Sequence, residues 1–270
     1  MQIHIGYDLT YEFDHPTPVI VMLNVHYSRV SDLVSPDTMV TEPPTPYTSY
    51  RDSYGNWCNR VLAPAGLFRL RADAVVNDSG EVDEVAVDAR QSAVEDLPQE
   101  TLMYLLPSRY CDSDVLSEEA WNLFGDVAAG WARVQAVSQW VHDHIEFGYQ
   151  WARAERTASQ AFAEGRGVCR DYAHLGVALC RGLNIPARYC SGYLSDIGVP
   201  PPADPTDFSG WFEVFLEGRW FTVDPRNLHP RRGRILIARG RDAADVAITT
   251  TFGTNVLRHF DVVTDEVAPS

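Results

Sequence analysis

The segment GRGVCRDYAHLGVALC, residues 165–180, holds a cysteine in a setting that suits a thiol nucleophile. Two glycines precede Cys169, and apolar residues at helical spacing predict a helix from about Cys169 to Leu183. At a helix N-terminus, backbone N–H groups and the helix dipole lower the pKa of a thiol, and the same groups can bind a developing oxyanion. The segment therefore predicts a catalytic cysteine, with a thiol buried at a helix start as the alternative. Gly167 and Tyr172 are expected in the wall of this site.

A second segment, DFSGWFEVFLEGRWFTVDPR at residues 207–226, predicts two strands joined by a tight turn at Glu217-Gly218. Counting outward from this turn places Trp211 opposite Asp224. Ser209 lies two residues before Trp211, so it is on the same face and diagonal to Asp224. In a cysteine site the base is a histidine that a carboxylate or amide orients. Ser209 occupies the place of that histidine, and a serine hydroxyl is not basic near neutral pH.

Eight histidines offer substitutes for the missing base. His229 follows Asp224 in a loop that can fold back toward the thiol, so it is the best substitute. His174 lies five residues past Cys169, around the helix from the thiol, and packing is the favoured role for it. Trp211 is expected at the wall of the site, with core packing as the safer interpretation. No cysteine or histidine spacing predicts a metal site, and no motif indicates a cofactor.

The elements that must position these residues fall into two regions with different periodicity. Alternation over residues 3–11, 19–27 and 68–76 predicts antiparallel strands, and hence a β-rich N-terminal domain over residues 1–90. Residues 91–112 are expected to form a linker. Helical spacing from Trp131 to Ile145 then opens a second domain over residues 113–270, with a β extension at its C-terminal end. The fold class that follows is α+β.

Composition excludes several classes of function. The net charge of -15 makes nucleic acid a poor partner, since phosphate contacts need a basic surface. No apolar run is long enough to span a membrane, and the first residues lack the pattern of a secretory signal, so a cytoplasmic location is expected. Arginines crowd between residues 226 and 241, and we interpret them as surface groups that pair with carboxylates rather than as an anion site.

Together these stretches resemble a bacterial transglutaminase-like protein. The segment GVCRDYAHLGVALCRGLNIPARYCSGYL, from Gly167, resembles the nucleophile helix of that superfamily, and WFEVFLEGRWFTVDPR resembles its second and third motifs. The resemblance covers nearly the whole chain and implies a papain-like cysteine proteinase/transglutaminase core behind the β-rich domain. It implies Cys169 as nucleophile and Asp224 as orienting acid. The family's His-Ala-Trp corresponds to Ser209, Gly210 and Trp211, so the triad histidine is replaced.

Two functions follow as hypotheses. The first is acyl transfer on a peptide, protein or small amide through a Cys169 thioester, resolved by water or by an amine. The second is a degraded site on a retained fold that serves as a binding or scaffold module. A weaker variant of the first takes an activated thioester, whose good leaving group needs less acid catalysis. The sequence leaves the substrate and the oligomeric state open.

Overall fold

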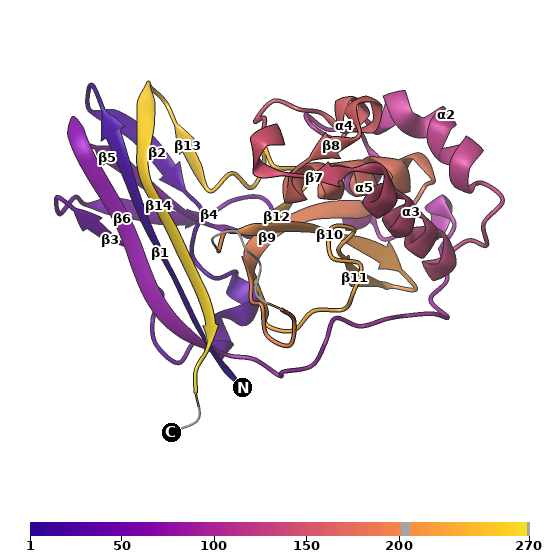
Figure 1. Ribbon diagram of the computed structural model, residues 1–270, viewed down its shortest axis with the longest axis horizontal. Helices are drawn as coiled ribbons and strands as arrows, with labels where there is room; N and C mark the ends of the chain where they lie inside the picture. Colours follow the sequence, from indigo (N-terminus) through magenta and orange to yellow (C-terminus); the bar gives the residue numbers. More distant parts are fainter. Residues whose placement is uncertain (201–205, 269–270) are drawn as a thin grey trace.

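The computed structural model describes residues 1–200 and 206–268, and it shows two lobes side by side (Figure 1). One lobe is built of strands, and the other combines helices with a sheet. Both lobes contribute to one continuous buried cluster of apolar residues. No helix among the described residues is long and apolar enough to cross a membrane.

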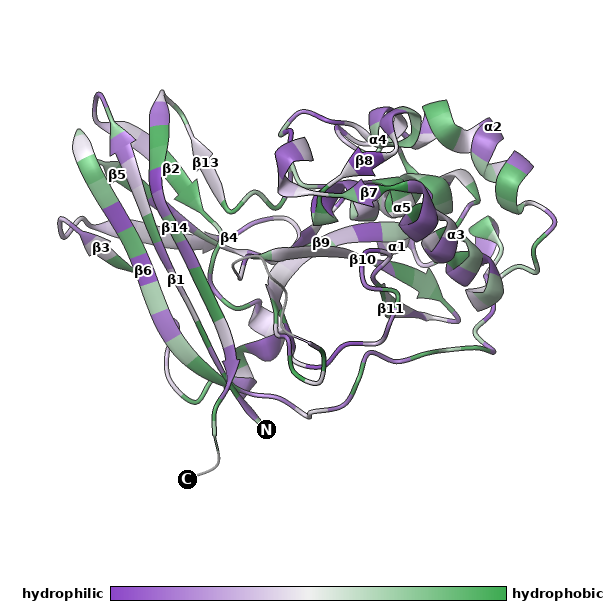
Figure 2. Ribbon diagram, in the orientation of Figure 1, coloured by the Kyte–Doolittle hydropathy of each residue, from purple (hydrophilic) through white to green (hydrophobic). Residues whose placement is uncertain are grey.

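The β lobe holds two four-stranded antiparallel sheets, ordered β14-β1-β6-β3 and β13-β2-β5-β4. Alternation places every second residue of β1, from Ile3 to Phe13, in the core, and Figure 2 shows the same alternation along β6. The strands of this lobe are β1 (Gln2–Phe13), β2 (Thr17–Val21), β3 (Val40–Glu42), β4 (Tyr47–Arg51), β5 (Trp57–Ala63), β6 (Gly66–Asn77), β13 (Thr249–Thr251) and β14 (Asn255–Glu266).

The mixed lobe is organised around α5, which packs on a sheet ordered β11-β10-β9-β12. Nearly every residue of α5 from Asp171 onward is buried, because α2, α3 and α4 cover the faces that the sheet leaves free. The elements of this lobe are α1 (Gln99–Leu102), α2 (Ser113–Phe124), α3 (Trp131–His144), β7 (Glu146–Phe147), α4 (Ala158–Glu164), β8 (Arg166–Gly167), α5 (Cys169–Gly182), β9 (Ala187–Leu194), β10 (Ser209–Leu216), β11 (Arg219–Val223) and β12 (Arg234–Gly240).

The division of the chain in space differs from the expected boundaries. Residues 113–270 do not form one unit, because β13 pairs with β2 and β14 pairs with β1 along almost its whole length. The C-terminal strands therefore complete the β lobe, and the chain enters and leaves the molecule there (Figure 1). The expected linker, residues 91–112, contains α1 and two short 3-10 helices, η2 (Val94–Asp96) and η3 (Met103–Leu105).

Candidate active site

Cys169 is the first residue of α5, as the sequence predicts, and its side chain is half-buried. The helix start is held by Asp171, which is 1% exposed and accepts hydrogen bonds from the Val168 backbone N–H (2.9 Å) and from Arg156 (2.8 Å). Gly167 is buried against Asp171, where an added Cβ would lie 2.5 Å from a carboxylate oxygen. The glycine before the cysteine thus serves the packing that fixes the helix start.

The hairpin has the register predicted from its turn. Glu217 and Gly218 have φ values of 48° and 82°, and Phe212 pairs with Val223. Both turn residues are therefore in the left-handed region that two-residue hairpins of this kind require. The pairing of β10 with β11 ends at this pair, so Ser209 has a strand partner only on the other side, Gly192 of β9.

The diagonal contact expected between Ser209 and Asp224 is not formed. Asp224 is 8% exposed, and its carboxylate accepts hydrogen bonds from Asn227 Nδ2 (2.8 Å) and from Arg234 (3.0 Å). Ser209 is 7% exposed, and its hydroxyl has no hydrogen-bond partner among the described residues. Asp224 therefore anchors the segment between β11 and β12.

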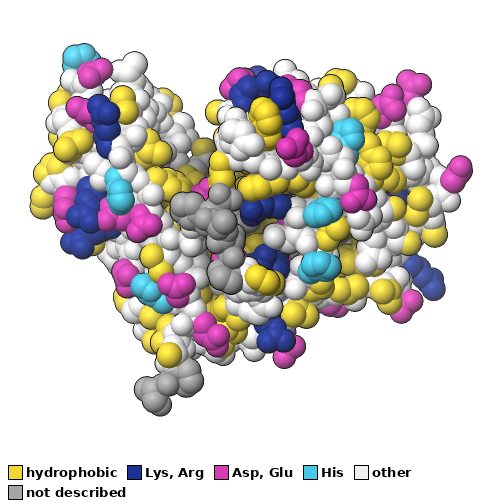
Figure 3. Space-filling model, viewed as in Figure 1, with side chains coloured by type: hydrophobic (Ala, Val, Ile, Leu, Met, Phe, Trp, Pro, Cys, Tyr) yellow, Lys and Arg dark blue, Asp and Glu magenta, His cyan; other side chains and the backbone are white. Residues whose placement is uncertain are grey.

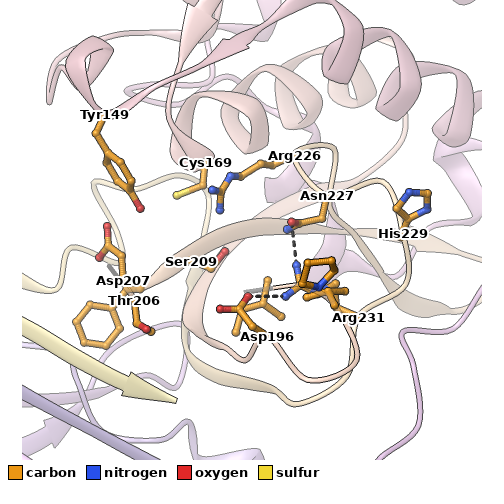
Figure 4. Close-up of a pocket in the computed structure, with 14 residues that line it drawn as sticks. Tyr149, Cys169, Asp196, Thr206, Asp207, Ser209, Arg226, Asn227, His229 and Arg231 are labelled. Carbon is orange, nitrogen blue, oxygen red and sulfur yellow. Dashed lines mark hydrogen bonds and ion pairs between the residues drawn. The ribbon is translucent and has the colours of Figure 1, made fainter. Parts of the chain in front are cut away.

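A pocket of about 340 Å³ opens at the thiol. Figure 4 shows Cys169, Arg226, Ser209 and Asp207 around the same space, with Arg226 directed at the thiol. On the outer surface, Figure 3 shows cationic side chains inside a hollow near the middle of the face. The pocket lining is Tyr149, Cys169, Leu194, Asp196, Val199, Pro200, Thr206, Asp207, Phe208, Ser209, Arg226, Asn227, His229 and Arg231.

The pKa of the Cys169 thiol is raised in the structure, whereas its position at a helix start predicted a lowered pKa. Burial raises the pKa of Cys169 above its ordinary value. The backbone N–H of Gly210 and the guanidinium of Arg226 act in the opposite direction, whereas Asp207 and Asp224 raise this pKa further. The helix start alone does not make a thiolate here, since loss of solvent penalises the charged form more strongly.

Asp207 is a pocket residue that the sequence analysis missed. Burial raises the pKa of its carboxyl, opposed by the Phe208 backbone N–H and by Arg226. The sequence holds a signal for it. Residues two apart in a strand lie on the same face, and Asp207, Ser209 and Trp211 have this spacing. Arg226 also lines the pocket, and the sequence does not distinguish it from the other arginines between residues 226 and 241.

Three of the six arginines of that stretch pair with carboxylates as predicted, but the side chains of Arg231 and Arg234 are only 8% and 7% exposed, so these two are not the surface groups that the sequence predicts. Arg231 contacts Asp196, Arg234 contacts Asp83 and Asp224, and Arg241 contacts Asp245. Arg226 lies at the thiol, and no carboxylate among the described residues lies within ion-pair distance of it. Its guanidinium instead lies 3.9 Å from the centre of the Phe147 ring.

The other predicted site residues lie farther from the thiol. His229 lines the pocket, but Figure 4 places it beyond Asn227 from Cys169. His174 is 0% exposed and accepts a hydrogen bond from the Ala243 backbone N–H, and burial lowers its pKa well below the usual value. It is a neutral packing residue.

Tyr172, which was expected at the site wall, is a core residue, and so is Trp211, for which core packing was the safer interpretation. Tyr172 is 3% exposed and donates a hydrogen bond to the Ile145 carbonyl. Trp211 is 1% exposed, with the Arg234 guanidinium 4.6 Å from its ring centre. Neither belongs to the lining of the pocket at Cys169. The described residues contain no cluster of three or more His, Cys, Asp or Glu side chains able to hold a metal ion.

Comparison with known proteins identifies the family. The model of the transglutaminase-like superfamily matches residues 123–225, which include Cys169, Ser209 and Asp224. A solved structure of a putative cysteine protease from Cytophaga hutchinsonii is 30% identical and superposes with a TM-score of 0.87, covering 100% of this chain and 92% of that one. The chain belongs to the transglutaminase-like superfamily, and the predicted papain-like core behind a β-rich N-terminal region is confirmed.

Two curated relatives match a shorter part of the chain. The uncharacterized protein ML0607 of Mycobacterium leprae is 30% identical over 118 residues, which are 42% of this chain and 42% of that protein. Kyphoscoliosis peptidase of Homo sapiens is 29% identical over 140 residues, which are 48% of this chain and 20% of that protein. The chain therefore matches less than half the length of either relative.

Proposed function

We propose that this protein is a cysteine-dependent hydrolase or acyltransferase for amide or peptide bonds, with Cys169 as its nucleophile. The observation that carries the proposal is the position of the thiol. Cys169 begins a buried helix, opens into a pocket of about 340 Å³ and lies against the Gly210 backbone N–H. The relation to a putative cysteine protease over the whole chain supports the same class of chemistry.

Asp207 is the proton acceptor that we propose in place of the missing histidine. It lines the same pocket, its charge acts on the thiol, and burial shifts its pKa upward, toward the range that suits a general base. The other candidates are less suitable, because Asp196 is paired with Arg231 and His229 lies beyond Asn227. A proton can pass between Cys169 and Asp207 directly or through one water molecule.

The reaction then runs in two halves. The Cys169 proton moves to Asp207 as Sγ bonds to the amide carbon, and backbone N–H groups at the start of α5 and of Gly210 meet the developing oxyanion. Asp207 returns the proton to the amine nitrogen as the C–N bond breaks, which leaves a thioester on Cys169. Water or a second amine gives a proton to Asp207 as it bonds to the thioester carbon, the C–S bond breaks, and Asp207 returns the proton to Sγ, which restores the thiol and releases the acid or the new amide.

A second candidate function, a binding module on a degraded site, rests on Asp224. This residue is committed to Arg234 and Asn227 and orients no base. In this alternative the thiol is an ordinary buried group. The cytoplasmic location stays part of the proposal, since all five cysteines are free, as suits a reducing compartment.

Turnover of a panel of N-acyl peptide p-nitroanilides, with and without hydroxylamine as acceptor, tests the proposal. Cys169→Ser should abolish release of p-nitroaniline, whereas Cys58→Ser in the β lobe should not. Asp207→Asn should lower kcat by at least about a hundredfold, as loss of a general base does. His229→Gln should stay within about threefold. Equal turnover by the Cys169→Ser variant would exclude Cys169 as the nucleophile, whereas no turnover of any substrate by the wild type would favour the binding module.

A further inference from the structure

Arg226 lies beside the thiol, and it has no counter-ion among residues 1–200 and 206–268. It lines the pocket and points at Cys169 (Figure 4), and no carboxylate of the described residues lies within 4.0 Å of it. Its guanidinium lies 3.9 Å from the centre of the Phe147 ring, which favours this position of the cation, and its N–H groups donate no hydrogen bond to a described residue. The chain has 37 acidic and 22 basic residues, so carboxylates that could pair with an arginine are in excess, and a pocket arginine without one suggests a binding role.

A buried hydroxyl lies on the same side of the pocket. Ser209 is 7% exposed, and its Oγ has no hydrogen-bond partner among the described residues. Figure 4 shows this oxygen directed into the space below Cys169 and Arg226. A buried polar group without a partner costs about 1 to 3 kcal/mol, so a ligand atom that accepts its proton would be stabilised there.

The other charged residues of the pocket do not occupy or neutralise the space beside Arg226 and Ser209. Arg231 is neutralised by Asp196, to which it is bonded at 3.1 Å. Asp207 has a raised pKa and makes no ion pair with Arg226 within 4.0 Å. A guanidinium and a hydroxyl are both donors, and a carboxylate is the acceptor whose planar shape suits a guanidinium.

We propose, resting on the function proposed above, that Arg226 and Ser209 form a subsite for a carboxylate of the substrate, close to the bond that Cys169 attacks. The substrate class is thus an amide that carries a free carboxylate a few bonds from the scissile carbonyl. The carboxylate belongs either to the acyl part or to the leaving amine. The replacement of histidine by Ser209 supplies the second donor of this subsite.

Alkylation of Cys169 tests the subsite without any need for turnover. Iodoacetate carries a carboxylate, whereas iodoacetamide is neutral and of nearly the same size. We would measure the rate constants of both reagents at Cys169, localised by mass spectrometry, and take their ratio, which cancels changes in the thiolate fraction. A cation a few ångströms from the reagent's carboxylate should raise the ratio of iodoacetate to iodoacetamide by about tenfold.

The variants decide the outcome. Arg226→Gln should lower this ratio by about tenfold, and Arg226→Lys should retain most of it. Arg232→Gln removes the same charge from an exposed residue outside the pocket lining, so its ratio should stay within twofold of the wild-type value. Equal ratios in the wild type and in Arg226→Gln would overturn the proposal. Failure of p-nitroanilide turnover leaves the ratio measurable, so the two proposals can fail separately.

Protection of Cys169 from iodoacetamide then identifies the source of the carboxylate. Succinamate carries it on the acyl side of its amide, and N-acetylglycine carries it on the amine side. Succinamide and N-acetylglycinamide are the neutral controls. Stronger protection by either anion than by its neutral control supports the subsite and assigns the side. No preference for either anion contradicts it.

Discussion

Asp224→Asn should destabilise the fold while leaving the Cys169 thiol reactive, because the carboxylate is bound to structural groups. It is 8% exposed and accepts hydrogen bonds from Asn227 and from Arg234, which is itself 7% exposed in its side chain. Arg234 also contacts Asp83 at 2.9 Å. The substitution removes one of the two negative charges that hold a buried guanidinium.

The magnitude follows from these contacts. Breaking a buried ion pair by removing one partner costs about 3 to 5 kcal/mol. Asp83 stays in contact with Arg234, and asparagine keeps the shape and one acceptor oxygen, so part of this cost is avoided. We expect the free energy of unfolding to fall by about 2 to 3 kcal/mol. Glu84→Gln is the control, because Glu84 and its partner Arg219 are both 57% exposed, and such an exposed pair contributes little to stability.

Urea unfolding gives the stability, and iodoacetamide gives the thiol reactivity of the folded protein. The predicted pattern is a lower midpoint at an unchanged m-value, with an alkylation rate at least equal to that of the wild type, since Asp224 raises the pKa of the thiol. Wild-type stability combined with lost turnover would refute this reasoning. It would show instead that Asp224 orients a catalytic group.

Three further predictions concern neighbouring charges. Asp207→Asn should speed alkylation of Cys169 near neutral pH, since it removes a charge that raises the thiol pKa, while turnover falls; slower alkylation would contradict this. Asp171→Ala should lower the free energy of unfolding by about 3 kcal/mol in urea, because it leaves Arg156, 3% exposed, without its buried partner; a change below about 1 kcal/mol would be inconsistent. Burial and nearby arginines lower the pKa of His26 to about 3, so the unfolded chain binds a proton that the folded protein excludes. Stability should therefore fall as the pH drops from about 6.5 toward 3, and His26→Gln should reduce that slope by up to about 1.4 kcal/mol per pH unit; an unchanged slope would count against it.

Local features of the sequence predicted local structure well. The Glu217-Gly218 turn fixed the register of the hairpin, because a two-residue turn leaves only one pairing. Helical spacing and stop signals placed α3 and α5 within one or two residues of their ends. Cys169 was found at its helix start because glycines and an apolar run mark such a boundary in the sequence.

Local sequence patterns did not predict contacts between residues that are far apart in the chain. Nothing in β14 indicates that it pairs with β1 rather than with the mixed lobe, since pairing partners leave no local signal. The ion pair between Asp224 and Arg234 depends on the position of β12 in the sheet, because Arg234 is the first residue of that strand. The opposing effect of burial on the Cys169 thiol also depends on tertiary packing, and a sequence pattern shows only the helix start.

The most direct test of the account is detection of a thioester on Cys169. The protein would be mixed with an N-acyl p-nitroanilide that carries a carboxylate, quenched in acid within the first turnover, and analysed by intact-protein and peptide mass spectrometry. The account predicts a mass increase of one acyl group on the peptide that contains Cys169, lost on treatment with hydroxylamine and absent from Cys169→Ser. Release of p-nitroaniline with no acyl group on Cys169, or with the group on another residue, would contradict it.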